Sequence, residues 1–249
     1  MICLVLAAGY ATRLYPLTEN FPKPLLEVKD KTILDLLLDD VDGTGLANRY
    51  IIISNHRYFG HFQEWAARKR LSAETDVLDD GSVSNETRLG AVADIQFAID
   101  AMKLDDDLLV LAGDNLLDFS LSGFVAYARR KMSSCVMRCF EPDVERLRQA
   151  GVLEMDGRDL VTRMEEKPSA PFSNWCVPPF YYYRGKDLPW IRKAIDDGCG
   201  IDAPGSLVAW LSRVIPVHAM EMPGKRYDIG DIESLRAVRE EFPGIIEIL

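Results

Sequence analysis

The chain opens with an apolar run that breaks directly into small side chains, and this opening limits the folds available to it. Residues Ile2–Leu6 are all apolar, and Ala7-Ala8-Gly9 follows them without a polar residue in between. The pattern predicts a buried strand that ends in a tight loop. Small side chains let such a loop approach a ligand closely and point several backbone N–H groups at it, which suits a phosphate chain. Arg13 and Lys23 follow on the same connection, so we expect a phosphate-binding element here.

Alternating helix and strand patterns follow the opening loop. The predicted elements are a helix over 32–43, a strand over 50–54, a helix over 58–70 and a short strand over 73–78. This alternation is typical of a doubly wound parallel sheet, in which ligands bind at the carboxyl ends of the strands. The loop after Leu6 lies at such an end.

A later strand pattern ends in an acidic residue. Leu108–Ala112 is the most apolar strand pattern in the chain, and it leads into Gly113-Asp114-Asn115. A carboxylate at the tip of a central strand is well placed to hold a hard cation. Further along, residues 151–154 and 160–164 flank an Asp156-Gly157 turn and predict an antiparallel hairpin.

Five motifs along the chain resemble those of the sugar-1-phosphate nucleotidylyltransferases, which join a nucleoside triphosphate to a sugar phosphate and release pyrophosphate. In order they are Gly9-Tyr-Ala-Thr-Arg-Leu-Tyr-Pro-Leu-Thr18 with Pro22-Lys-Pro-Leu25, the helix start at Gly90, Gly113-Asp-Asn115, Glu166-Lys-Pro168 and Tyr227-Asp-Ile-Gly230. The resemblance implies an α/β fold: a Rossmann-like mixed, mostly parallel sheet flanked by helices, with an antiparallel sugar-binding insert. It also implies one nucleotidyltransferase domain over residues 1–249, with 1–133 mainly binding the nucleotide and 134–249 mainly binding the sugar phosphate.

The resemblance also assigns roles to individual residues. Arg13 would hold the β- and γ-phosphates, Lys23 the α-phosphate and Lys167 the sugar phosphate, while Asp114 and Asp228 would hold Mg²⁺. The nucleotide would be bound by Leu6, Ala7, Ala8, Gly9, Tyr10, Ala11, Thr12, Asn85 and Gly90. The sugar phosphate would be bound by Asn115, Gly151, Glu166, Lys167, Asn174 and Tyr181. Lys225 and Arg226 could also reach phosphate but are expected to be mainly solvated, and Asp231 is expected to cap the last helix.

Composition narrows the expected partners. The net charge of −10 disfavours binding to nucleic acid or to an anionic membrane, so a nucleotide site must be made locally positive. The N-terminus lacks a basic leader, and no apolar run is long enough to cross a bilayer. Five scattered cysteines without C-x-x-C spacing predict reduced thiols. We therefore expect a cytoplasmic protein. The resemblance implies that its partners are an NTP and a sugar 1-phosphate, and homo-oligomer formation is left open.

The sequence disfavours two other functions. A dinucleotide-dependent oxidoreductase is disfavoured because G-x-G-x-x-G is absent and Ser54-Asn55 stand where an acidic residue is needed. A non-catalytic relative that senses nucleotide sugars is disfavoured because every catalytic cation and carboxylate of the family is present.

The base and the sugar stay open, because Asn85 and Pro178-Pro179 lie where the sequence departs most from the family pattern. UTP or TTP with a glucose-like 1-phosphate is the default expectation. Cytidylyl or guanylyl transfer to a heptose, mannose or choline phosphate is the alternative.

Overall fold

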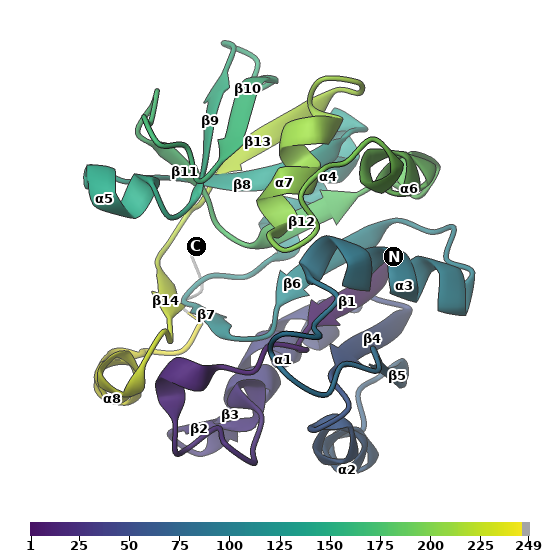
Figure 1. The fold of residues 1–249 in the computed structure, drawn as a ribbon, viewed down its shortest axis with the longest axis vertical. Coiled ribbons are helices and arrows are strands. Elements are labelled where there is room, and N and C mark those ends of the chain that lie inside the picture. Colours follow the sequence, from purple (N-terminus) through teal and green to yellow (C-terminus); the bar gives the residue numbers. More distant parts are fainter. Residues whose placement is uncertain (246–249) are drawn as a thin grey trace. The chain divides into compact units, whose positions relative to one another are not determined.

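The computed structural model describes residues 1–245, and these belong to two compact units that are each discontinuous in sequence (Figure 1). The first unit contains residues 1–88, 112–122 and the segment from Pro223 onward, and the second contains 89–111 and 123–222. The predicted division into nucleotide-binding and sugar-binding halves stays a prediction. Within the described part of the chain, every helix is too short or too polar to span a bilayer.

The first unit is built on a parallel sheet in the order β1-β4-β5. Its strands are β1 (Ile2–Leu6), β4 (Arg49–Ser54) and β5 (Glu74–Asp79), and its larger helices are α1 (Ile33–Gly43) and α2 (Phe59–Lys69). Thr32 caps α1 through a capping box with Asp35, which satisfies donors at the helix start that would otherwise lack partners. The strand-helix-strand order predicted from the sequence is confirmed.

Short elements from distant parts of the sequence complete the first unit. These are η1 (Thr12–Leu14), η2 (Lys23–Leu25), β2 (Glu27–Val28), β3 (Lys31–Thr32), β7 (Asn115–Leu117), β14 (Arg226–Asp228) and α8 (Ile232–Glu241). Strand β14 pairs antiparallel with β7, so the two lie side by side (Figure 1). Leu14, Leu116 and Tyr227 belong to one buried apolar cluster that also contains Leu235 and Phe242. Apolar packing therefore holds the chain's beginning, middle and end together in this unit.

The second unit contains a largely antiparallel sheet in the order β10-β9-β11-β8-β12-β6, with β13 parallel to β8. Its strands are β6 (Leu108–Ala112), β8 (Ser134–Phe140), β9 (Gly151–Met155), β10 (Val161–Glu166), β11 (Trp175–Val177), β12 (Phe180–Tyr183) and β13 (Val217–Glu221). Its helices are α3 (Ala91–Met102), α4 (Ser122–Lys131), α5 (Val144–Leu147), η3 (Gly185–Asp187), α6 (Pro189–Asp196) and α7 (Pro204–Leu211). The β9–β10 hairpin confirms the predicted antiparallel excursion, and the expected mixed α/β fold is confirmed as a whole.

Strands β11 and β12 are separated by two prolines, and the pairing of β11 with β8 brings two cysteines together. Pro178 and Pro179 separate β11 from β12, and both short strands pair with β8. Proline has no N–H for the ladder, which explains the break. The same pairing places Cys176 opposite Cys139, with 2.9 Å between their Sγ atoms. No disulfide joins the five cysteines, all of which lie in the described residues.

Candidate active site

The loop after β1 is anchored at its flanks and exposed at its tip. Asn55 Nδ2 donates to the carbonyl of Ala8 at 3.0 Å, and the Tyr10 hydroxyl donates to the carbonyl of Ser82 at 2.9 Å. Thr18 Oγ1 donates to the carbonyl of Ala11 at 2.8 Å, and the backbone of Ala11 is in the left-handed region with φ 45°. Gly9 is exposed, and a Cβ built on it would meet nothing within 4 Å. The loop is therefore held in shape with its glycine open to solvent.

Exposure continues past the loop into the first short helix. Thr12 and Arg13 are both exposed, and η1, which contains them, follows directly on the left-handed Ala11. An exposed arginine four residues after an exposed glycine is compatible with the predicted phosphate binding. The phosphate contacts themselves stay a prediction.

Lys23 is a buried cation with a carboxylate partner. It lies in η2 between Pro22 and Pro24, and only 7% of the residue is exposed. Its Nζ donates to Asp114 Oδ2 at 2.8 Å. A buried ammonium needs such a partner, because an isolated charge in the interior is strongly unfavourable. The structure thus joins two residues that the sequence assigned to the same site.

Gly113 explains why Asp114 reaches this position. Its N–H donates to the carbonyl of Leu6 at 3.0 Å. A Cβ on this glycine would lie 2.9 Å from Val5 Cγ1 and 3.3 Å from the Leu6 carbonyl oxygen. No larger residue fits without displacing β1 or the turn. Gly113 therefore holds the Asp114 turn against the carboxyl end of β1.

The β7–β14 pairing brings the second predicted metal carboxylate to the same turn. Asp228 is the register partner of Asn115, whose Nδ2 donates to Asp114 Oδ1 at 2.6 Å. Arg226 Nη1 donates to Asn115 Oδ1 at 2.8 Å and lies 3.8 Å from Asp228 Oδ2. The expectation that Arg226 is mainly solvated is wrong: its side chain is 30% exposed and is bonded to a residue that is 2% exposed. The expectation for Lys225 is confirmed, since its side chain is 61% exposed.

The two predicted metal ligands, Asp114 and Asp228, are carboxylates, which is the ligand chemistry that suits a magnesium ion. Among residues 1–245, no group of three or more His, Cys, Asp or Glu side chains could hold a metal. Mg²⁺ prefers oxygen ligands and is commonly bound through one or two carboxylates together with substrate phosphates. Asp114 and Asp228 are two such carboxylates, and their binding of magnesium stays a prediction. Asp231, by contrast, caps α8 as predicted, accepting from the N–H of Ser234 at 2.8 Å.

The predicted base-binding residues have local structural partners. Asn85 is exposed, and its Oδ1 accepts from Arg88 Nη1 at 2.9 Å. Gly90, in the second unit, starts α3 with φ 96°, and a Cβ there would lie 2.6 Å from the carbonyl oxygen of Ile201. Backbone packing accounts for this glycine without a ligand. Recognition of a base by either residue stays a prediction.

The second unit brings together Gly151, Glu166 and Lys167. Gly151 and Glu166 are register partners in the β9–β10 hairpin. A Cβ on Gly151 would lie 3.0 Å from Glu166 Oε2, and a Cβ on Gly205 would overlap that oxygen. Two glycines thus make space for one carboxylate, and its burial raises the pKa of Glu166. Lys167 follows in the left-handed region with φ 49°, and it is exposed.

Asn174 and Tyr181 are the other sugar-site candidates of the second unit, and Asn115, described above, belongs to the first unit. Asn174 is exposed, and its Nδ2 donates to the carbonyl of Glu141 at 3.0 Å. Tyr181 is 3% exposed and lies in β12 between β6 and β8, with its ring stacked on that of Tyr183 at 6.1 Å. Both side chains have structural contacts, and their predicted contacts with a sugar stay untested predictions.

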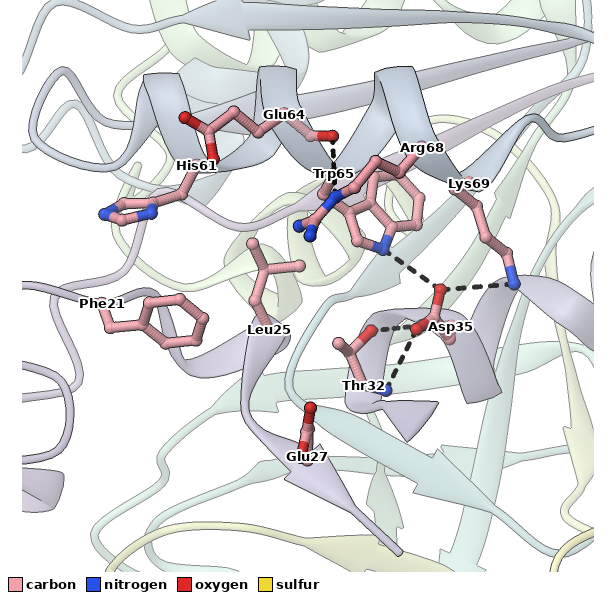
Figure 2. A pocket seen from close by; sticks show the side chains of 10 residues that line it. All are labelled: Phe21, Leu25, Glu27, Thr32, Asp35, His61, Glu64, Trp65, Arg68 and Lys69. Carbon is pink, nitrogen blue, oxygen red and sulfur yellow. Dashed lines mark hydrogen bonds and ion pairs between the residues drawn. The ribbon is translucent and has the colours of Figure 1, made fainter. Parts of the chain in front are cut away.

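A separate cavity of about 510 Å³ lies elsewhere in the first unit (Figure 2). None of its lining residues belongs to the predicted site. Trp65 Nε1 donates to Asp35 Oδ1 at 3.1 Å, and Lys69 Nζ lies 3.2 Å from the same oxygen (Figure 2). Because Asp35 also completes the capping box of α1, these polar groups are accounted for by the fold.

Comparison with known proteins shows the family to which the chain belongs. The chain matches the family described as nucleotidyl transferase over residues 2–242. It is 31% identical over 186 residues to a candidate mannose-1-phosphate guanyltransferase of Sulfolobus acidocaldarius, a match that covers 73% of this chain and 48% of that protein. It is 24% identical over 240 residues to the UTP–glucose-1-phosphate uridylyltransferase of Synechocystis sp., with 93% and 61% covered. The chain therefore spans about half to three fifths of the length of these relatives.

A solved structure shares the fold. The crystal structure of a UDP-glucose pyrophosphorylase complexed with UDP-glucose superposes with a TM-score of 0.81 at 17% identity, covering 97% of each chain. At this identity the likeness concerns the fold alone. The family match extends over nearly all of the chain and includes all five motifs. On this evidence, the chain belongs to the nucleotidyl transferase family.

Proposed function

We propose that the protein transfers a nucleoside monophosphate from an NTP to a sugar 1-phosphate, giving an NDP-sugar and pyrophosphate. The observation that carries the proposal is the Lys23–Asp114 pair at 2.8 Å, beside a loop with an open glycine. A buried cation and a fixed carboxylate at the end of β1 suit a nucleotide's phosphates and a divalent cation. Family membership supports the same reaction class.

The reaction is a displacement at the α-phosphorus. An oxygen of the sugar phosphate forms the new P–O bond, and the bond to pyrophosphate breaks in line. A phosphate monoester has a second pKa of about 6, so the nucleophile is already anionic near neutral pH. The chain therefore needs no general base.

The difficulty of the reaction is that two polyanions must meet. Two unit charges 4 Å apart repel by about 4 kcal/mol at an effective dielectric constant of 20. We infer that Arg13 binds the β- and γ-phosphates, Lys23 the α-phosphate and Lys167 the sugar phosphate. An ammonium has three donors, and within residues 1–245 the one hydrogen bond of Lys23 Nζ goes to Asp114, so donors remain for a phosphate.

We infer that the metal is Mg²⁺ and that Asp114 and Asp228 hold it. When bound, it would neutralise negative charge on the reacting phosphates and fix their geometry. The protein's own part is to orient the two carboxylates and to supply the three cations. The cytoplasm is the compartment that we propose, because NTPs and sugar phosphates are available there.

The substrate pair is the open part of the proposal. UTP or TTP with a glucose-like 1-phosphate is the first pair to test. The relatives named above are a guanyltransferase of mannose 1-phosphate and a uridylyltransferase of glucose 1-phosphate, and a further relative is named a glucose-1-phosphate adenylyltransferase. These names cover three bases and two sugars, so they do not single out one pair.

The test is a pyrophosphate-release assay with each NTP against a panel of phosphorylated acceptors in the presence of Mg²⁺. The proposal predicts pyrophosphate and NDP-sugar in equal amounts for at least one pair. Pyrophosphate without NDP-sugar would identify a hydrolase instead. Tight binding of an NDP-sugar without turnover for any pair would identify a sensing relative, and either result would overturn the proposal.

A further inference from the structure

Arg226 lies within a continuous polar network of the first unit. Its Nη1 donates to Asn115 Oδ1 at 2.8 Å, and Asn115 Nδ2 donates to Asp114 Oδ1 at 2.6 Å. The other oxygen of Asp114 accepts from Lys23 Nζ at 2.8 Å. Each carboxylate oxygen of Asp114 therefore has one donor, and one of these donors is itself held by Arg226.

Asn115 links Arg226 to Asp114 because the two ends of its side-chain amide differ, so a bond at one end determines which group faces the other. The carbonyl oxygen accepts and the NH₂ group donates. Rotating the amide would place the NH₂ group against the guanidinium and the oxygen against the carboxylate, and both contacts would be repulsive. Asn115 is 2% exposed, so water does not compensate for a lost partner. The guanidinium thus fixes which end of the amide faces Asp114.

The same guanidinium lies near the second carboxylate. Arg226 Nη1 is 3.8 Å from Asp228 Oδ2, and the two residues lie on β14 opposite β7. Its neighbour Lys225 points elsewhere, with its Nζ 3.9 Å from Glu241 Oε2 and a side chain twice as exposed. One planar group with several donors can serve both Asn115 and Asp228, which a single ammonium does less well.

We propose that Arg226 is a positioning residue: through Asn115 it orients the Asp114 carboxylate, and it steadies Asp228 beside it. This inference rests on the proposed function, in which those two carboxylates hold a divalent cation. Arg226 acts through its neighbours and is not assigned a contact with substrate. Outer-shell partners of metal ligands typically change metal affinity by about 10- to 100-fold when they are removed.

The test compares Arg226→Met with Lys225→Met, which removes an adjacent cation on the same segment. Direct binding of Mn²⁺ is measured by electron paramagnetic resonance without nucleotide, and thermal unfolding is followed alongside. Arg226→Met is expected to weaken Mn²⁺ binding at least about tenfold. Lys225→Met is expected to stay close to wild type, and Arg226→Lys to recover part of the loss.

Kinetics supply a second readout in active protein. Arg226→Met should raise the Mg²⁺ concentration for half-maximal rate about as much as it weakens Mn²⁺ binding, while the KM for the sugar phosphate changes little. A general structural defect would lower kcat at every metal concentration. If Arg226→Met is unstable at the assay temperature, Asn115→Leu breaks the same link from its other end and is expected to give the same loss of Mn²⁺ affinity.

The inference fails if folded Arg226→Met or Asn115→Leu binds Mn²⁺ as wild type does. Failure of the proposed function gives a different result, because wild type then releases no pyrophosphate whatever the variants bind. If the wild-type protein is active and both variants bind metal normally, the positioning role of Arg226 is wrong and the proposed function still holds.

Discussion

Lys23 Nζ donates to Asp114 Oδ2 at 2.8 Å although 91 residues separate them in the sequence. The two partners differ in burial, since 9% of the Lys23 side chain and 39% of the Asp114 side chain are exposed. Loss of the ion pair would therefore leave the charge of Lys23 buried without a partner, whereas water could still solvate the more exposed Asp114 carboxylate. This asymmetry bears on both of the first two predictions.

Asp114→Asn is expected to lower turnover by at least about 100-fold, because it removes a charge that the transfer reaction needs. The side chain keeps its size, so circular dichroism should show a folded protein. Pyrophosphate release measures the loss. Asp118→Asn is the matched control, since Asp118 accepts from the N–H of Lys225 on the same pair of segments and has no assigned role in transfer. Near-wild-type turnover in Asp114→Asn would contradict the assignment of Asp114 as a metal ligand.

Lys23→Ala is expected to lower kcat by about 100-fold or more while changing the KM for the sugar phosphate by less than about threefold. The reason is that Lys23 is assigned to the α-phosphate and not to the acceptor. Its stability should fall less than that of Asp114→Ala, because the latter leaves a buried ammonium without its partner. Steady-state kinetics and urea unfolding measure the two effects. Equal losses in kcat and in sugar-phosphate binding would place this lysine elsewhere.

Gly113→Ala is expected to lower the stability of the protein, whereas Gly9→Ala is expected to affect nucleotide binding without changing stability. The first adds a Cβ only 2.9 Å from Val5 Cγ1 and should cost about 2 kcal/mol of unfolding free energy through overpacking. The second adds a Cβ with nothing within 4 Å, so stability should change little. If the loop binds phosphate closely, Gly9→Ala should instead raise the KM for NTP. A stable Gly113→Ala, or a Gly9→Ala variant with unchanged KM, would contradict the respective assignment.

Glu166→Gln is expected to stabilise the protein near neutral pH. Burial raises the pKa of Glu166 in the folded state, so between its unfolded and folded pKa values the folded protein binds a proton that the unfolded chain releases. Folding stability of wild type therefore rises as pH falls through that window. The advantage of the glutamine variant should shrink between about pH 8 and about pH 5. Urea unfolding at both pH values checks this, and an advantage independent of pH would show that ionisation is not its cause.

Local signals in the sequence predicted the parts of the structure that depend on near neighbours. The apolar run before Ala7, the helix that was predicted from residue 32 and the Asp231 cap of α8 are each explained by residues within one turn or strand. The motif order then identified the family. Periodicity could not reveal β7 and β14, because strands of three residues carry too little pattern.

Contacts between distant residues that no shared motif links could not be predicted from the sequence, because they depend on strand register. Arg226 forms a hydrogen bond with Asn115, which is 111 positions away in the sequence. The β7–β14 register brings the two residues together. Cys139 and Cys176 likewise become neighbours through the β8–β11 register. Tyr181 was predicted from its place in a motif, whereas its burial follows from β12 lying between two other strands.

The apolar cluster that joins Leu14, Leu116 and Tyr227 has a consequence for biosynthesis. Every segment of the second unit has been translated before Pro223 leaves the ribosome, so that unit can fold on the nascent chain. The first unit must wait for the segment that follows residue 222, because β14 and α8 contribute to its apolar cluster. The second unit can therefore form before the first, and Asp228 can pair with Asn115 only after residues 123–222 have been made.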